Sequence, residues 1–232
     1  MDIVWNANYK LLVNPFPIFP KHLTIPCVQH TAQAISRRIG DMMALAQILE
    51  DYELFYNGPN CGASAPDHMH FQAGLKGYMP FVSDMENAAK QEVLKKDNAA
   101  LSLVSGLERI AFVIDADDVK SGTEMFELLY RHLPISDGEY EPKINLLCQY
   151  DGNRWTIIVF PRSKHRPKCY WASGDEQILV SPASVDMGGL IALPREADFE
   201  KLKPEDITQI YKEVSISLRD AQTIVNRIVM SL

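Results

Sequence analysis

The alternation of apolar runs and turn-forming residues predicts a chain made mostly of short strands. Apolar runs bounded by Gly, Pro, Asn or Asp indicate strands over residues 9–13, 22–26, 53–56, 67–75, 100–104 and 109–115. The same pattern indicates later strands over residues 144–150, 155–160, 178–181 and 190–194. The Asp151-Gly152-Asn153 turn is typical of a hairpin and joins two of these strands.

Apolar positions at helical spacing predict helices in the remaining segments. One helix starts at a Thr31 cap and runs to about Asp51. Others are expected over residues 85–91 and 121–133, and a terminal helical region of one or two helices over 203–229. The order of strands, helix and loop in the first half recurs approximately in the second half. We therefore treat residues 1–232 as a single unit with two halves, 1–98 and 99–232.

Composition places the chain among ordinary globular proteins and excludes several classes of function. Of its 232 residues, 47% are hydrophobic and 23% are charged. No apolar run approaches the roughly 20 residues of a membrane span, and the N-terminus lacks the pattern of a signal peptide, so we expect a cytoplasmic protein without a membrane partner. A net charge of −7 argues against a nucleic-acid partner. The widely spaced cysteines indicate free thiols.

The stretch from Tyr56 to Ala73 concentrates the candidate chemistry. It reads YNGPNCGASAPDHMHFQA, and small turn-forming residues precede His68, His70 and Gln72 in it. Alternate side chains of a strand share one face, so these three would point into one site. Imidazole is nucleophilic and largely neutral near pH 7, and a neutral histidine can attack phosphorus and form a covalent intermediate.

The loop before the histidines suits a phosphate group. Small residues let main-chain N–H groups approach phosphate oxygens closely, and a serine adds a hydroxyl donor. The candidate nucleotide- and phosphate-binding residues of this loop are Asn57, Gly58, Gly62, Ala63 and Ser64. An isolated pair of histidines two residues apart is also typical of a metal site or of partly buried structural side chains. The glutamine and the loop favour phosphoryl chemistry over these alternatives.

Loop and motif together resemble the active-site motif of the histidine-triad superfamily, in its transferase branch. That branch includes galactose-1-phosphate uridylyltransferase, diadenosine tetraphosphate phosphorylase and GDP-L-galactose phosphorylase. Here Gly62-Ala63-Ser64 precedes the HMHFQ motif at residues 68–72. More weakly, NPFPIFPKHLTIP is similar to the segment on the base and ribose side of the family's pocket, which places Asn14 near the ribose. The resemblance implies an α+β fold in which a mainly antiparallel sheet carries the motif and helices pack on it.

The resemblance also implies roles for the motif. His70 would attack the α-phosphorus and become nucleotidylated, Gln72 would hold the intermediate, and His68 would orient the site or bind a metal. The hydrolase branch has a third histidine where this chain has Gln72, and glutamine cannot pass a proton to a poor leaving group. We therefore expect a nucleotidyltransferase or a phosphorylase, which needs no cofactor for its chemistry. The substrates would be a nucleotide or nucleotide sugar and a phosphate-bearing acceptor.

Several features keep alternatives open. A histidine-triad nucleotide hydrolase and a catalytically impaired nucleotide-binding protein that lacks the family's N-terminal part are the runner-up interpretations. Some uridylyltransferases hold a structural zinc, and His30 and His68 match its two histidines, but no CxxC pair precedes them. The spacing from Ser64 to His70 is one residue longer than in the better-known transferases of this branch, with Asp67 as the apparent extra residue. Arg162 and Lys164 lie in a basic loop that would either contact a phosphate or be solvated. A homodimer is a further expectation.

Overall fold

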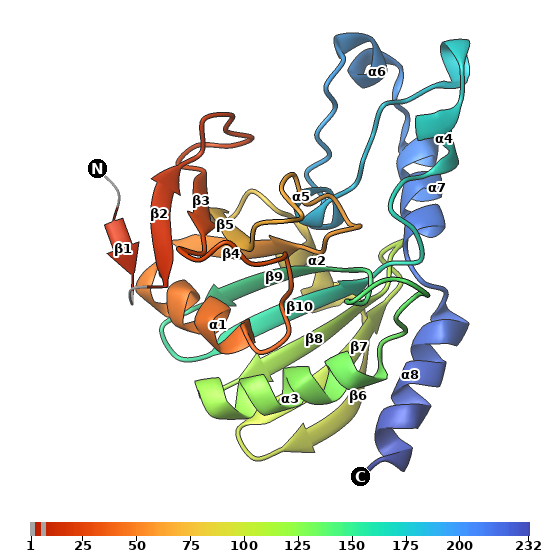
Figure 1. Ribbon diagram of the computed structural model, residues 1–232. Coiled ribbons are helices and arrows are strands. Elements are labelled where there is room, and N and C mark those ends of the chain that lie inside the picture. Colours follow the sequence, from red (N-terminus) through yellow and green to blue (C-terminus); the bar gives the residue numbers. More distant parts are fainter. Residues whose placement is uncertain (1–2, 6–7) are drawn as a thin grey trace.

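A computed structural model describes residues 3–5 and 8–232, and its centre is one large antiparallel sheet (Figure 1). Within these residues the sheet has 10 strands in the order β1-β2-β3-β5-β4-β9-β10-β8-β7-β6. The strands are β1 Ile3–Trp5, β2 Tyr9–Val13, β3 Leu23–Pro26, β4 Tyr52–Asn57, β5 His70–Leu75, β6 Ala89–Lys96, β7 Ala99–Ser105, β8 Ala111–Ala116, β9 Ile144–Tyr150 and β10 Trp155–Pro161. The predicted α+β fold with a mainly antiparallel sheet is confirmed.

Helices cover both faces of the sheet. Their bounds are α1 Ile39–Ile48, α2 Phe81–Asp84, α3 Val119–His132, α4 Lys168–Trp171, α5 Ser184–Met187, α6 Glu196–Lys201, α7 Pro204–Val214 and α8 Leu218–Met230, with short 3₁₀ turns at Met85–Asn87 and Gly174–Glu176. The helices α1 and α3 lie side by side on one face, where α1 packs on β4 and β9 and α3 packs on β7 and β8 (Figure 1). On the opposite face, a second apolar cluster joins the sheet to α2, α5 and α7.

The strand order is symmetric about the β4–β9 pair. Reading outward from this pair, β5, β3, β2 and β1 follow on one side, and β10, β8, β7 and β6 follow on the other. The helix α1 lies between β3 and β4 in the chain, and α3 lies between β8 and β9, so the helices match as well. The second symmetric unit thus begins with β6, whereas the predicted boundary at 98/99 falls inside the β6–β7 hairpin.

Several predicted elements are correct and several are wrong. The β9–β10 hairpin, the β7–β8 pair, α3 and the two terminal helices lie where the pattern placed them. The first helix begins at Ile39 and not at Thr31, because Arg37 adopts a left-handed backbone with φ of 63°. Residues 89–96 form the edge strand β6 in place of the end of a helix. Residues 178–181 and 190–194 form no strand.

The segment between β2 and β3 packs against β5 through the side chain of Phe19. Phe19 packs so closely on β5 that a Cβ at Gly74 would lie 1.6 Å from the Phe19 ring. The ring also packs against His22 and Phe55, with centroids 5.0 and 5.9 Å away. Gly74 is therefore required for this close approach, and the contact fixes the segment that carries His22 beside the motif.

Candidate active site

His70 is the first residue of β5, and one nitrogen of its ring has no hydrogen-bond partner among the residues that the structure describes. Its Nδ1 lies 2.9 Å from the main-chain oxygen of His68. A carbonyl only accepts hydrogen bonds, so Nδ1 carries the proton and Nε2 keeps its lone pair. The side chain is 6% exposed, and burial lowers its pKa below the usual histidine value, against a smaller raising effect of the His68 carbonyl. The ring is therefore neutral at physiological pH, as a nucleophile must be.

Gln72 lies two residues along the same strand and is held by His22. The main-chain N–H of Ile18 donates to Nδ1 of His22 at 3.2 Å, so the proton of this ring is on Nε2. Nε2 then donates to Oε1 of Gln72 at 2.8 Å. With its oxygen occupied, Gln72 has its NH₂ group left to donate to a ligand beside His70. His22 is itself buried, which lowers its pKa and keeps it neutral.

His68 lies outside the strand, contrary to the sequence prediction of three alternating side chains on one face. The strand begins at His70, because His68 belongs to a turn in which its N–H bonds to the oxygen of Ala65. The Nε2 of His68 lies 2.7 Å from the carbonyl oxygen of Cys27 and ties the motif to the end of β3. His68 thus contributes its main-chain oxygen to the site, through the bond to His70, more directly than its ring.

The two predicted zinc residues lie together, but they lack partners for a metal. The rings of His30 and His68 have centroids 4.7 Å apart, and His30 pairs with Asp67 at 3.3 Å. Among the residues that the structure describes, no group of three or more His, Cys, Asp or Glu side chains could hold a metal ion. Because His68 also uses Nε2 for a main-chain bond, this donor set does not fit a structural zinc.

Asn57 ends β4 and joins the loop to the rest of the molecule. Its Oδ1 accepts hydrogen bonds from Asn145 Nδ2 at 2.9 Å and from the main-chain N–H of Ser184 at 2.7 Å. Asn145 also donates to the oxygen of Cys61. The side chain of Asn57 therefore connects β4, β9 and the start of α5. Its predicted role at a phosphate stays a prediction.

The glycines of the loop have packing roles, and the loop offers free donors. A Cβ at Gly58 would lie 2.9 Å from the oxygen of Ile144, and one at Gly62 would lie 2.6 Å from Ala183. Gly62 also has φ of +94°, a conformation that glycine tolerates. The main-chain N–H groups of Gly62, Ala63 and Ser64 form no hydrogen bond within the described part of the chain. Three adjacent N–H groups without partners suit an anion.

Cys61 could compete with His70 as a nucleophile in this loop, but its environment argues against it. Its side chain is fully buried, and burial raises the pKa of the thiol to about 11. The nearby Arg162 and Lys143 lower this pKa by less than burial raises it. The thiol is therefore protonated at neutral pH, and only the thiolate is nucleophilic.

Arg162 is a structural connector, which corrects its expected role as a phosphate contact. The side chain is 4% exposed. Its Nε donates to Val214 O, Nη1 to Asn145 Oδ1 and Pro182 O, and Nη2 to Lys164 O and His165 O. A guanidinium has five N–H groups, and all are used, so none is left for a phosphate. The Nζ of Lys164 lies 3.8 Å from Oε2 of Glu213, and the lysine side chain is partly exposed. Its contact with a substrate stays a prediction.

The sequence interpretation missed two polar residues that the fold brings to the motif. His22 stands two positions before Thr24, so the two side chains lie on the same face of the extended chain. Asn14, the predicted ribose residue, lies next to both, because its Nδ2 donates to Thr24 Oγ1 at 3.0 Å and lies 3.4 Å from His22 Nε2. Gln33 is fully buried and bonds to the main chain of His70. No periodicity of the sequence marks it.

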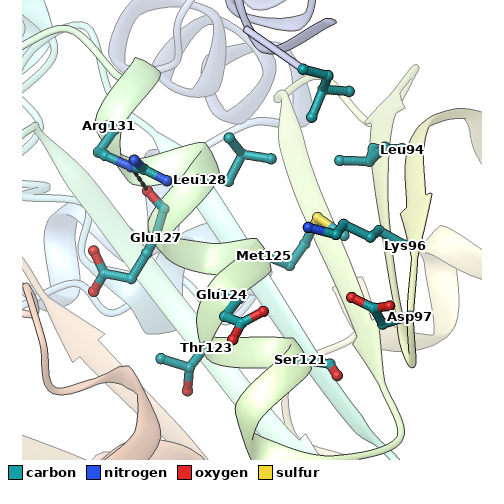
Figure 2. A pocket seen from close by; sticks show the side chains of 11 residues that line it. Leu94, Lys96, Asp97, Ser121, Thr123, Glu124, Met125, Glu127, Leu128 and Arg131 are labelled. Carbon is teal, nitrogen blue, oxygen red and sulfur yellow. Dashed lines mark hydrogen bonds between the residues drawn. The ribbon is translucent and has the colours of Figure 1, made fainter.

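A cavity of about 350 Å³ lies elsewhere in the molecule, between α3 and the β6–β7 hairpin (Figure 2). Leu94, Met125, Leu128 and Leu232 form its apolar lining, and Lys96, Glu124 and Arg131 are among the polar residues around it. None of the motif residues lines it, so it does not belong to the candidate active site.

No helix in the described part of the chain is long and apolar enough to cross a membrane.

Comparison with solved structures shows the fold. Yeast Ap4A phosphorylase matches with a TM-score of 0.60 at 21% identity, over 90% of this chain and 72% of the yeast chain. A DUF4931 family protein from Bacillus cereus ATCC 10987 matches with a TM-score of 0.52 at 18% identity, over 81% of this chain and 96% of the other. No match was found among curated proteins.

Family models cover most of the chain. Residues 1–75 match the model described as a domain of unknown function, DUF4922. Residues 110–232 match the model described as GDPGP1-like, C-terminal domain, which is more than half of the chain. Together with the fold, these matches confirm the resemblance noted in the sequence. The chain belongs to the GDPGP1-like family and is a member of the transferase branch of the histidine-triad superfamily.

Proposed function

We propose that this protein transfers a nucleotidyl group from a nucleotide phosphoanhydride to phosphate, or to a phosphate-bearing acceptor, through a covalent nucleotidyl-His70 intermediate. One observation carries the proposal. The bond from His70 Nδ1 to the His68 oxygen fixes the proton on Nδ1 and leaves Nε2 as a neutral nucleophile. The free N–H groups of the loop from Gly62 to Ser64 and the NH₂ of Gln72 are the donors that would bind the phosphoryl oxygens.

The reaction runs in two displacements. Nε2 of His70 attacks the α-phosphorus, an N–P bond forms, and the anhydride P–O bond breaks to release a sugar phosphate or a nucleoside polyphosphate. An oxygen of the acceptor phosphate then attacks the same phosphorus, and the N–P bond breaks. His70 returns to its neutral form and the product is a nucleoside diphosphate. No general acid is needed when the leaving group is itself a phosphate, which agrees with glutamine at position 72.

The names of the relatives indicate which substrates to test. A yeast structure of the same fold is an Ap4A phosphorylase, and the matching family is described as GDPGP1-like. We therefore propose dinucleoside polyphosphates and nucleoside diphosphate sugars as the two substrate classes. The first would release a nucleoside polyphosphate in the first step, and the second would release a sugar phosphate.

Intact-protein mass spectrometry tests the proposal. The protein is incubated with a panel of dinucleoside polyphosphates and nucleoside diphosphate sugars, first without phosphate. We expect a mass increase of one nucleoside monophosphate residue, which disappears with release of nucleoside diphosphate when phosphate is added. Nucleotide release in water that is no slower than in phosphate would favour a hydrolase. Binding of nucleotide without an adduct or turnover would favour a protein that only binds.

Replacing His22 with phenylalanine should slow the reaction about tenfold in kcat. Phenylalanine is slightly larger and keeps an aromatic ring beside Phe19 and Phe55, but it removes both ring nitrogens. The N–H that holds Oε1 of Gln72 is lost, together with the acceptor for the N–H of Ile18. Gln72 can then turn its oxygen toward the phosphoryl group, which loses one hydrogen bond, or about 1.4 kcal/mol. Steady-state kinetics on the substrate found above measures the effect.

The matched control for His22 is the same substitution at His132. This histidine is half-buried on α3, where its Nδ1 bonds to the oxygen of Leu128, and it belongs to no part of the candidate site. His132→Phe should leave kcat within about twofold of the wild type. Equal kcat values for the two variants would show that His22 does not act through Gln72.

A further inference from the structure

We infer that Gln33 is a positioning residue for the nucleophile: its side-chain amide takes the place of a missing strand partner and fixes the main chain of His70. The inference rests on the proposed function and adds a residue outside the motif. Gln33 lies in the irregular segment between β3 and α1 and is fully buried. Its amide group bonds to the main chain of two site residues that lie on different strands.

The strands β4 and β5 stop pairing where the site begins. Their last paired residues are Phe55 and Gln72, so Asn57 and His70 come after the ladder has ended. On its other side β5 pairs with β3, where Cys27 N donates to Met69 O and Pro26 lies opposite His70. Alternate residues of an antiparallel strand direct their N–H and C=O groups to opposite neighbours. The main-chain groups of His70 therefore face the end of β4, where Asn57 is in register with His70 but no longer pairs with it.

Gln33 fills this gap with one amide group. Its Oε1 accepts from the N–H of His70 at 2.8 Å, and its Nε2 donates to the oxygen of His70 at 3.0 Å and to the oxygen of Asn57 at 2.9 Å. All three main-chain groups are buried, and a buried group without a partner is costly. The amide thus both satisfies the groups and sets the distance between the ends of the two strands.

The main-chain N–H and C=O groups of Gln33 are themselves both hydrogen-bonded. Its N–H donates to the oxygen of Pro66, in the loop that leads to the motif, at 3.0 Å, and its oxygen accepts from the Tyr140 hydroxyl at 3.3 Å. Two residues later, the N–H of Ile35 donates to Glu141. The amide is therefore preorganised, and it transmits a fixed position to His70.

Two contacts together set the direction in which Nε2 of His70 points. The bond from Nδ1 to the His68 oxygen sets the rotation of the ring relative to its own main chain, and Gln33 sets where that main chain lies. Together they leave the nucleophile little freedom. A displacement of the reacting atoms by about 1 Å can cost about 100-fold in rate. Loss of the amide should therefore slow the chemical step and leave substrate binding nearly unchanged.

The test is a single-turnover experiment on Gln33→Met, which keeps the length and volume of the side chain but removes its hydrogen bonds. Adduct formation is followed by rapid quench and mass spectrometry, with each variant held below its melting temperature. We expect the rate constant to fall by about 100-fold while the final amplitude and the substrate concentration for half-maximal rate change by less than about threefold. The matched control is Gln29→Met, an exposed glutamine of the same segment, which should behave as the wild type.

The outcomes separate positioning from a purely structural role. A lower amplitude with an unchanged rate constant would mean that Gln33 only keeps the protein folded, and it would overturn the inference. Gln33→Asn, whose amide is one methylene too short to reach, is the second variant and should also lose rate rather than amplitude. If the wild type forms no adduct, the proposed function fails. If the wild type forms one and both variants match its rate constant, the inference alone fails.

Discussion

Replacement of His70 by alanine should abolish the covalent adduct and lower nucleotidyl transfer by roughly 10⁴-fold or more. The reason is that Nε2 of this ring is the proposed nucleophile, because the His68 oxygen fixes the proton of the ring on Nδ1. The buried Cys61 cannot replace it, because its thiol stays protonated. Intact-protein mass spectrometry measures the adduct, and product release in the presence of phosphate measures turnover.

The alanine variant at His165 provides the comparison. His165 lies in the basic loop after β10, where its Nε2 is 3.4 Å from the hydroxyl of Ser181, and burial lowers its pKa to about 4. It is therefore another neutral histidine, and only one of its ring nitrogens has a side-chain contact in the described part of the chain. His165→Ala should keep the adduct. An adduct that survives in His70→Ala and disappears in His165→Ala would move the nucleophile to the basic loop and refute the proposed mechanism.

Replacement of Arg162 by alanine should lower the free energy of unfolding by roughly 3–5 kcal/mol. The guanidinium joins β9, the start of the basic loop, the segment before α5 and the end of α7 through its hydrogen bonds. Alanine leaves these buried acceptors without donors and opens a cavity beside them. Urea denaturation followed by circular dichroism measures the change.

Two comparisons distinguish this structural role from phosphate binding. Lys164→Ala removes a partly exposed charge from the same loop and should change stability by no more than about 0.5 kcal/mol. Below its melting temperature, Arg162→Ala should keep the KM for phosphate within about threefold of the wild type. A large increase in that KM with little loss of stability would restore the original interpretation of Arg162 as a phosphate contact.

The elements that the sequence predicted correctly are those set by local patterns. The β9–β10 hairpin has a strong turn signal, and α3 has a capping Asp118, whose carboxylate accepts from the N–H of Ser121. The strand β6 was missed because it is a mostly exposed edge strand, with no apolar face to mark it. It becomes a strand through its pairing with β7, and the pattern of residues within β6 alone does not reveal that partner.

Long-range hydrogen bonds explain the other wrong elements. In the segments predicted as strands near 178–181 and 190–194, carboxylates take main-chain donors that a neighbouring strand would otherwise receive. Asp198 accepts from the N–H of Leu179, and Asp186 accepts from that of Ala192. The sequence contains both acidic residues, but it does not show which distant N–H group each will meet.

In the candidate site, too, local patterns could be predicted from the sequence and long-range contacts could not. The motif identified His70 and Gln72, and the structure places both on one strand beside a loop with free N–H groups. What the motif could not show is how its residues are held. His22 comes from the segment before β3 and Gln33 from the segment between β3 and α1, and they meet the motif only after β3 pairs with β5.

The two halves of the symmetric sheet differ in the connection that carries the histidine motif. The β4–β5 connection, from Gly58 to Met69, carries the loop with the free N–H groups of Gly62, Ala63 and Ser64, whereas its counterpart between β9 and β10 is the tight turn from Asp151 to Arg154. At the matching place β10 begins with Trp155-Thr156-Ile157 and has no histidine. The duplicated framework therefore carries the histidine motif in one half and no counterpart of it in the other. Under the proposed mechanism each chain would carry a single nucleotidyl group, on His70, so titration of the adduct would count active molecules directly.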